Sequence, residues 1–283
     1  MLVWAVASQK GGVGKTTTVA TLAGWLQKEK LRVLVVDTDP HASLTSYLGY
    51  EDERSEQFNL FDLYAMKDLS REGVLKCITH TAHERLDLIA ASMTLATIDR
   101  HLSGRQGVGR ILARSLKLIE DCYDVVLIDC PPVLGALMVN ALVASTTIIV
   151  PTQTEFLALK GLEGMVRTFT VMQRANQSVH FEYLIVPTMY DRRTKASVQS
   201  LSYLKTHYRD HMWHESIPVD VSFRESSAKR LPLPLMDETR QGAVSYHRLL
   251  KFIVEFELER HPQRVGSKLL EMLENLQYMP DQI

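Results

Sequence analysis

The stretch Ser8-Gln-Lys-Gly-Gly-Val-Gly-Lys-Thr-Thr-Thr18 decides the fold of this chain of 283 residues. It follows an apolar run at residues 3–7 and precedes a segment whose apolar residues recur with helical spacing. Glycines at this point let the backbone form a concave nest of N–H groups that bind phosphate oxygens. The helix that follows turns its positive end to the same anion. The pattern therefore predicts a phosphate-binding loop.

Two residues of this loop carry the expected chemistry. Lys15 is predicted to lie against the outer phosphates, and the Thr16 hydroxyl is predicted to ligate Mg²⁺. The general pattern G-x-x-x-x-G-K-S/T is not met in full, because Gln9 stands where its first glycine belongs, and Lys10 is an additional lysine. The alternative is a glycine-rich turn without a ligand. The strand before the loop and the helix after it favour phosphate binding.

Acidic side chains follow two other apolar runs. Asp37 and Asp39 come after residues 33–36, and Asp129 comes directly after residues 125–128. Ligands of open parallel sheets bind outside the carboxyl ends of the strands, so we expect these carboxylates near the phosphate loop. Asp129 suits Mg²⁺ coordination, direct or through water. Each aspartate could instead cap a turn, and for Asp37 both interpretations remain open.

The apolar runs alternate with segments of helical periodicity. Strands are predicted at residues 3–7, 33–36, 86–89, 125–128, 147–150 and 183–186. Parallel strands need crossover connections, so the predicted fold class is α/β, with three layers: a mostly parallel sheet and helices on both of its faces. We expect a single domain over residues 1–260, with a long helix at 243–257, and a helical tail over residues 261–283.

Composition excludes several classes of protein. Hydrophobic residues make up 46% of the chain and charged residues 23%, which argues against extensive disorder. The formal net charge of -1 gives no overall basic field for DNA or an anionic membrane, so such binding would need a local patch. The three cysteines contain no C-x-x-C pair, which suits a reducing cytosol and gives no support to a zinc site. No run approaches the about 18 apolar residues that span a bilayer, so we expect a cytoplasmic protein without membrane insertion.

Together these motifs resemble the ParA/MinD group of P-loop ATPases, also called the deviant Walker A family. The matching stretches are Lys10-Gly-Gly-Val-Gly-Lys-Thr-Thr17, Asp37-Thr-Asp39-Pro and Asp129-Cys-Pro-Pro, and similarity continues to about residue 257. The resemblance implies an ATPase that converts ATP to ADP and phosphate with Mg²⁺. Its nucleotide-binding residues would be Lys10, Gly11, Gly12, Val13, Gly14, Lys15, Thr16 and Thr17, with Met189 and Pro218 packed on the adenine.

The resemblance also implies a mechanism. ATP would close two subunits face to face into a homodimer, and each Lys10 would reach the nucleotide of the partner. The catalytic residues would be Lys10, Lys15 and Asp39, of which Asp39 orients the attacking water. Thr16, Asp39 and Asp129 would hold the metal, and Asp129 would also report the state of the γ-phosphate. Hydrolysis would separate the two subunits of the dimer. The protein would therefore act as a switch that controls localisation.

Within the family, the chain is most similar to ParC-like proteins, which are encoded with bacterial chemotaxis genes. This similarity rests on Thr38 and on His41-Ala-Ser-Leu-Thr-Ser-Tyr-Leu-Gly-Tyr50. We therefore expect a switch ATPase that positions chemotaxis arrays through a protein adaptor, at the cell pole or over the nucleoid. The alternative is a DNA partition ATPase for a plasmid or a chromosome.

Partition proteins of this family bind DNA without sequence specificity through basic residues. Arg240 fits one such position, and Arg224 and Arg230 could supplement it. The alternative is that these arginines are solvated surface charges. Val219 and Ser222 stand where partition proteins commonly carry arginine, which weakens the partition interpretation.

Metabolic enzymes of the same fold form a third class. An iron–sulfur reductase needs a cysteine several residues beyond Asp129, whereas Cys130 follows it directly. An amide-forming cobyrinate synthase would add a glutaminase domain, for which no residues remain. A MinD-like membrane helix would be basic, but the polar face of the tail helix carries Glu271 and Glu274. We expect its apolar stripe to pack on this protein or on a partner; the stripe consists of Leu269, Leu273 and Leu276.

Overall fold

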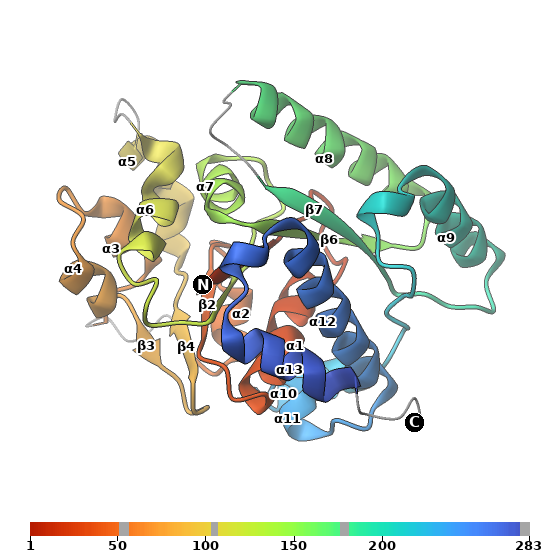
Figure 1. The fold of residues 1–283 in the computed structure, drawn as a ribbon. Coiled ribbons are helices and arrows are strands. Elements are labelled where there is room, and N and C mark those ends of the chain that lie inside the picture. The colour runs from red at the N-terminus through yellow and green to blue at the C-terminus, as the bar shows by residue number, and fades with distance from the viewer. Residues whose placement is uncertain (51–56, 103–106, 176–180, 278–283) are drawn as a thin grey trace.

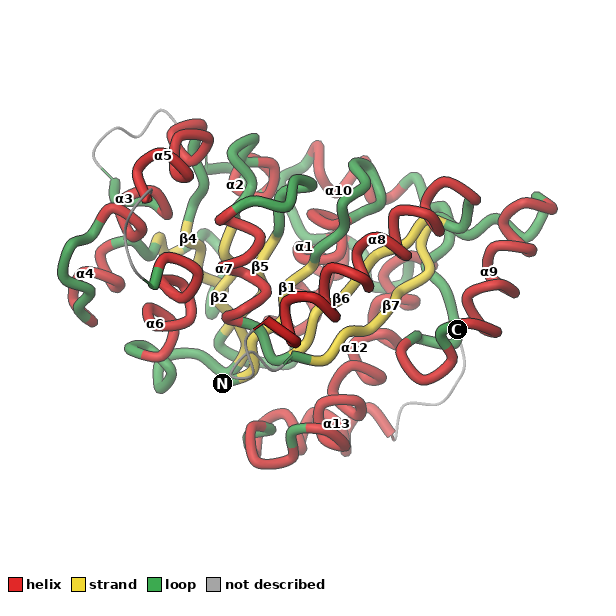
Figure 2. The backbone as a smooth tube through the Cα atoms, turned by 90° about the horizontal axis from the view of Figure 1, so that it is seen from above, coloured by secondary structure: helices red, strands yellow, loops and turns green. Residues whose placement is uncertain are grey.

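The computed structural model describes residues 1–50, 57–102, 107–175 and 181–277. Within these residues, seven strands form one sheet in the order β3-β4-β2-β5-β1-β6-β7. Figure 1 shows the fold, and the order from β4 to β7 can be followed in Figure 2. Neighbouring strands pair in parallel, except that β3 is antiparallel to β4. Six strands overlap the predicted runs, and the two-residue β3 is an addition. The strands are β1 Leu2–Val6, β2 Val33–Asp37, β3 Thr79–His80, β4 Leu86–Ile89, β5 Val125–Asp129, β6 Thr147–Gln153 and β7 Glu182–Thr188.

Helices connect the strands and follow the last of them. Those up to β7 are α1 Lys15–Lys28, α2 Ser43–Tyr47, α3 Leu60–Ala65, α4 Arg71–Lys76, α5 Ile98–Leu102, α6 Ile111–Lys117, α7 Ala136–Ala144 and α8 Phe156–Ala175. Those after β7 are α9 Lys195–His207, α10 Ser222–Ala228, α11 Leu233–Met236, α12 Gln241–Arg260 and α13 Ser267–Gln277. The helix predicted at residues 243–257 is therefore α12, which extends a few residues further at each end.

The sheet is covered on both faces, which confirms the predicted three-layer α/β class. In β1, Val3 and Ala5 belong to one apolar cluster, and the three residues that alternate with them belong to the other. Residues of α3 to α9 complete the first cluster, and residues of α1, α2, α11, α12 and α13 complete the second. Helices thus lie on both sides of the sheet (Figures 1 and 2). Because both faces are buried, β1 is apolar along its whole length, and β2 and β5 are apolar up to the aspartate that ends each of them.

A buried carboxylate ties α12 to the sheet. Glu257 is fully buried and accepts hydrogen bonds from Trp4 Nε1 and Thr146 Oγ1, each at 2.7 Å. A carboxylate in this position would cost free energy without such donors. The contact fixes α12 against β1, the strand that leads into the phosphate loop.

The tail helix α13 packs on the protein itself. Leu269 and Leu273 are buried in the same cluster as the apolar face of α12, as the helical stripe predicts, while the side chain of Leu276 lies outside the described residues. Lys268 Nζ donates to Asp124 Oδ2 at 3.2 Å and adds a polar contact. The division between residues 1–260 and 261–283 stays a prediction. Among the described helices, none is long and apolar enough to cross a membrane.

Candidate nucleotide site

The phosphate loop connects the end of β1 to the start of α1. Gly12 and Gly14 have φ angles of 74° and 96°, in the left-handed region that L side chains rarely adopt. Gly14 is the N-cap of α1, and no described side chain caps the helix there. The first N–H groups of α1 therefore remain available to an anion, as the sequence predicts.

Lys15 lies over this loop. Its side chain is largely buried, and its Nζ donates to the main-chain oxygen of Lys10 at 3.4 Å. The ammonium group is thus held above the nest of N–H groups, where a phosphate would be bound. A compact point charge in this position suits the outer phosphates of a nucleotide.

Thr16 and Asp129 meet at the ends of α1 and β5. The Thr16 hydroxyl donates to Asp129 Oδ2 at 2.6 Å. Asp129 is almost fully buried, and its other oxygen, Oδ1, has no hydrogen-bond partner among the described residues. Burial, with the nearby charge of Asp37, raises the pKa of Asp129 well above its usual range. An unsatisfied buried carboxylate oxygen beside a hydroxyl is a site that a cation would stabilise.

Mg²⁺ fits this donor set. No described group of three or more His, Cys, Asp or Glu residues could hold a metal ion by itself. Mg²⁺ in nucleotide sites, however, is commonly held by one or two protein oxygens together with phosphates and water. Thr16 and Asp129 supply two such oxygens beside the phosphate loop.

Asp37 organises the end of β2. It is fully buried; its Oδ2 accepts from Thr45 N at 2.9 Å and Thr45 Oγ1 at 2.8 Å, and its Oδ1 accepts from Asp39 N at 3.1 Å. Asp37 lies opposite Asp129 in the β2–β5 pairing. Burial raises the pKa of Asp37 to about 6. Asp37 thus accepts hydrogen bonds from the segment that follows β2, as a turn-capping aspartate would. Its charge also raises the pKa of Asp129.

Asp39 faces a partner that the sequence analysis did not single out. Its Oδ1 accepts from the main-chain N–H of His41 at 3.0 Å and contacts the His41 ring Nδ1 at 2.9 Å. Thr16 and Asp129 are hydrogen-bonded to each other, whereas Asp39 stands slightly apart, near enough for its charge to raise the pKa of Asp129. Its roles with water and metal stay predictions.

Lys10 is held within its own subunit. Its ammonium forms an ion pair with the Glu155 carboxylate and donates to Gln153 Oε1 at 3.1 Å. Both partners follow the buried part of β6, the strand beside β1. Neither partner was predicted from the sequence, although a position at the end of an apolar run is a signal that could have identified both.

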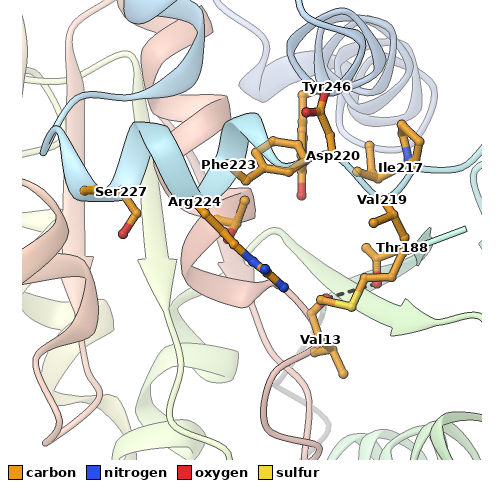
Figure 3. Close-up of a pocket in the computed structure, with 14 residues that line it drawn as sticks. Val13, Thr188, Ile217, Val219, Asp220, Phe223, Arg224, Ser227 and Tyr246 are labelled. Atoms are coloured by element: carbon orange, nitrogen blue, oxygen red, sulfur yellow. Dashed lines mark hydrogen bonds between the residues drawn. The ribbon is translucent and has the colours of Figure 1, made fainter.

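A cavity of about 520 Å³ opens beside the loop (Figure 3). Met189 and Pro218, the two predicted adenine residues, line it together with the loop residues Val13, Gly14 and Thr17. Its volume lies in the range of small-molecule sites. The Thr188 hydroxyl donates to the Val13 oxygen at 3.0 Å, which joins the end of β7 to the loop. The other residues that line the cavity are Thr188, Ile217, Val219, Asp220, Phe223, Arg224, Ser227, Ala228 and Tyr246.

The three arginines proposed for DNA have different surroundings. Arg224 lies in the wall of the cavity, and Arg230 is exposed just after α10. Arg240 is the N-cap residue of α12, and its Nε donates to Asp237 Oδ2 at 2.9 Å. Their part in DNA binding stays a prediction.

Comparison with known proteins agrees with this geometry. Residues 1–181 match a family model described as an AAA domain. The sporulation initiation inhibitor protein Soj of Bacillus subtilis (strain 168) is 36% identical over 248 residues, which cover 87% of this chain and 96% of that protein. This chain belongs to the ParA/MinD family of P-loop ATPases. The chromosome partitioning protein ParA of Caulobacter vibrioides is 33% identical over 261 residues, 91% of this chain and 96% of that protein.

Solved structures support the same family fold. Cobyrinic acid a,c-diamide synthase from Mycobacterium smegmatis, crystallised with bound ADP and magnesium, superposes with a TM-score of 0.76 at 30% identity. The match covers 93% of this chain and 96% of that chain. Membership of the ParA/MinD family makes this protein a nucleotide hydrolase of the group that acts in positioning and partition.

Proposed function

We propose that this protein is an ATP-hydrolysing partition switch that dimerises when it binds ATP. The observation that carries the proposal is the Thr16–Asp129 pair, whose buried, unpartnered Oδ1 lies beside a loop shaped for phosphate. The solved relative with bound ADP and magnesium supports the same ligands here. Mg²⁺ on this pair would neutralise charge on the outer phosphates.

Residues of the loop and of the cavity would bind different parts of ATP. The N–H groups at the start of α1 bind the phosphates, and Lys15 adds a positive charge beside them. The cavity wall formed by Met189 and Pro218 receives the adenine. Asp39 would orient the attacking water once the site closes around the nucleotide.

The surface around Lys10 supports assembly with a second copy. The Lys10 side chain is part-exposed beside Glu155. Large apolar side chains follow both neighbouring strand ends: Val133 after β5 is 71% exposed, and Phe156 and Leu157 after β6 are 67% and 70% exposed. Exposed apolar groups gathered around a charged site are typical of protein interfaces. ATP-dependent closure would cover them and bring each Lys10 to the nucleotide of the other subunit.

The relatives favour partition as the output. The Caulobacter vibrioides relative is named a chromosome partitioning protein, which supports the partition interpretation over the chemotaxis cargo that the sequence suggested. DNA without sequence preference and a protein adaptor would then be the partners, and the nucleoid would be the site of action. With a net charge of -1, DNA contact would depend on a local group that includes Arg240.

Amide synthesis is less compatible with this chain. The Mycobacterium smegmatis synthase has about the length of this chain, so chain length does not separate the two functions. The cysteines do: burial raises the pKa of the Cys77 thiol to about 12 and also raises the pKa of the buried Cys130. The third cysteine, Cys122, comes before β5, at the opposite end of that strand from Asp129. Transfer of ammonia from glutamine commonly uses an activated thiolate, which needs a lowered pKa.

Two substitutions test the proposed function. Lys15→Ala should abolish ATP binding, because the charge beside the loop is lost. Asp39→Ala should keep ATP binding but lower steady-state turnover by about 10²–10⁴-fold, the usual contribution of a positioned acid–base group. Equilibrium binding and phosphate release measure the two effects, and Lys117→Ala, an exposed lysine of α6, is the control. Normal turnover of Asp39→Ala would refute the role of Asp39, and a wild-type protein that bound no ATP would refute the function.

A further inference from the structure

Arg224 is an exposed cation that lines the cavity, and the phosphate-loop chemistry does not use it. Its side chain extends from α10 toward Val13 (Figure 3). The guanidinium has no hydrogen-bond or ion-pair partner among the described residues. Five N–H donors thus face a space that holds few acceptors.

The one acidic residue in the cavity wall is already engaged. Asp220 Oδ1 accepts from Ser222 N at 2.8 Å and Ser222 Oγ at 2.6 Å, and its Oδ2 accepts from Gly242 N at 2.8 Å. These three donors hold the Asp220 carboxylate at the starts of α10 and α12. Most of the remaining wall is apolar, so the positive charge of Arg224 is not balanced within the cavity.

The backbone that carries Arg224 is fixed from two sides. Tyr47 of α2 is hydrogen-bonded to Ser226 of α10. Phe223 packs edge-on against Tyr246 of α12, with ring centroids 5.7 Å apart, and the Tyr246 hydroxyl is hydrogen-bonded to Thr18 of α1 at 2.7 Å. The helix that presents Arg224 is therefore tied to the helix that follows the phosphate loop.

The cavity has a phosphate end and a base end. Gly14 and Thr17 line it at the start of α1, where a phosphate would bind, and Met189 and Pro218 line the apolar part. The outer phosphates would face Lys15 and the Thr16–Asp129 pair, outside this wall. The phosphate attached to the sugar would lie between the two ends, within the cavity that Arg224 enters.

We propose that Arg224 binds the α-phosphate of the nucleotide, and that it serves this site and not DNA. The inference rests on the proposed function, because it requires an adenine nucleotide in the cavity. A guanidinium matches a phosphate in charge and in the geometry of its paired donors. The phosphate would supply the acceptors that the cavity wall lacks.

The test compares ligands that differ in the α-phosphate. ADP, AMP and adenosine compete with a fluorescent ADP for wild type, Arg224→Ala and Arg224→Lys. Arg224→Ala should bind ADP and AMP about 10–100-fold more weakly, the usual loss for a hydrogen bond to a charged group, and should bind adenosine as wild type does. Arg224→Lys should recover part of the loss. Arg114→Ala, an exposed arginine on α6, should change none of the three affinities.

Two results would overturn the inference while leaving the proposed function intact. An equal loss for adenosine and AMP would place the guanidinium on the base. Unchanged affinities for AMP and ADP would make Arg224 a surface charge. A wild-type protein that bound none of the three ligands would instead refute the proposed function itself. Thermal unfolding of each variant confirms that the loss does not come from misfolding.

Discussion

In the proposed ATP-dependent dimer, Lys10 would have to leave Glu155 before it could reach the nucleotide of the second subunit. In the structure its ammonium is paired with the Glu155 carboxylate and bonded to Gln153 Oε1 at 3.1 Å. The side chains of Lys10 and Glu155 are 30% and 39% exposed, so water and salt screen the pair. A screened pair of this kind contributes about 0.2–1 kcal/mol.

Glu155→Gln removes the charge and keeps the size of the side chain. Two such pairs would break when a dimer forms, so the substitution should favour ATP-dependent dimerisation by about 0.4–2 kcal/mol. That corresponds to an about 2–30-fold lower dissociation constant of the dimer. The gain should shrink as salt is added, because screening already weakens the pair that is removed.

Sedimentation equilibrium with ATP and Mg²⁺ measures this constant in an Asp39→Ala background, where hydrolysis is slow. Glu163→Gln is the matched control, since Glu163 lies on α8, the helix that begins directly after Glu155, and pairs with Lys160 instead. The control should dimerise as the parent does. A dimer constant that stays unchanged or rises in Glu155→Gln would show that Glu155 does not restrain Lys10, or that it binds Lys10 of the partner.

Two further predictions concern DNA and pH. Arg240→Glu should weaken DNA binding and, by removing one phosphate contact from each subunit, make the slope of log affinity against log salt about 1.8 less steep while leaving dimerisation intact; a mutant that binds DNA like the parent would disprove this contact. Burial raises the pKa of Asp37 from 3.8 to about 6, so the folded protein holds this proton more tightly than the unfolded chain does. Protonated Asp37 therefore contributes up to about 3 kcal/mol to the free energy of unfolding. This contribution is complete below pH 3.8 and is lost as the pH rises to about 6. Urea titrations between pH 4 and pH 7 give the free energy of unfolding of wild type and of Asp37→Asn. The wild-type value minus the mutant value should fall as the pH rises, and a difference that does not change with pH would contradict the prediction.

Local patterns were enough to predict most of the strands. Buried parallel strands need apolar side chains on both faces, so six of the strands could be recognised as short apolar runs in the sequence. The periodicity of residues 243–257 identified α12, because one face of that helix is buried along its length. The strand β3 escaped prediction because it has only two residues and pairs with a single neighbour.

Contacts between distant segments could not be predicted. Glu257 lies 253 positions after Trp4, and Glu155 lies 145 positions after Lys10, so no local pattern links the members of either pair. The sequence also left the role of Asp37 open. Only its burial, and the donors from Thr45 that come with burial, show how it is held.

The sequence by itself determined where a nucleotide site would lie. A glycine-rich loop between strand and helix, together with aspartates at the ends of parallel strands, can meet only at one edge of such a sheet. The tertiary structure decided what that site contains: the unpartnered oxygen of Asp129, the cavity shared by Val13 and Pro218, and the arginine that enters it. These features depend on burial and on the packing of α10 and α12 against the loop, which are properties of the whole fold and not of any one segment.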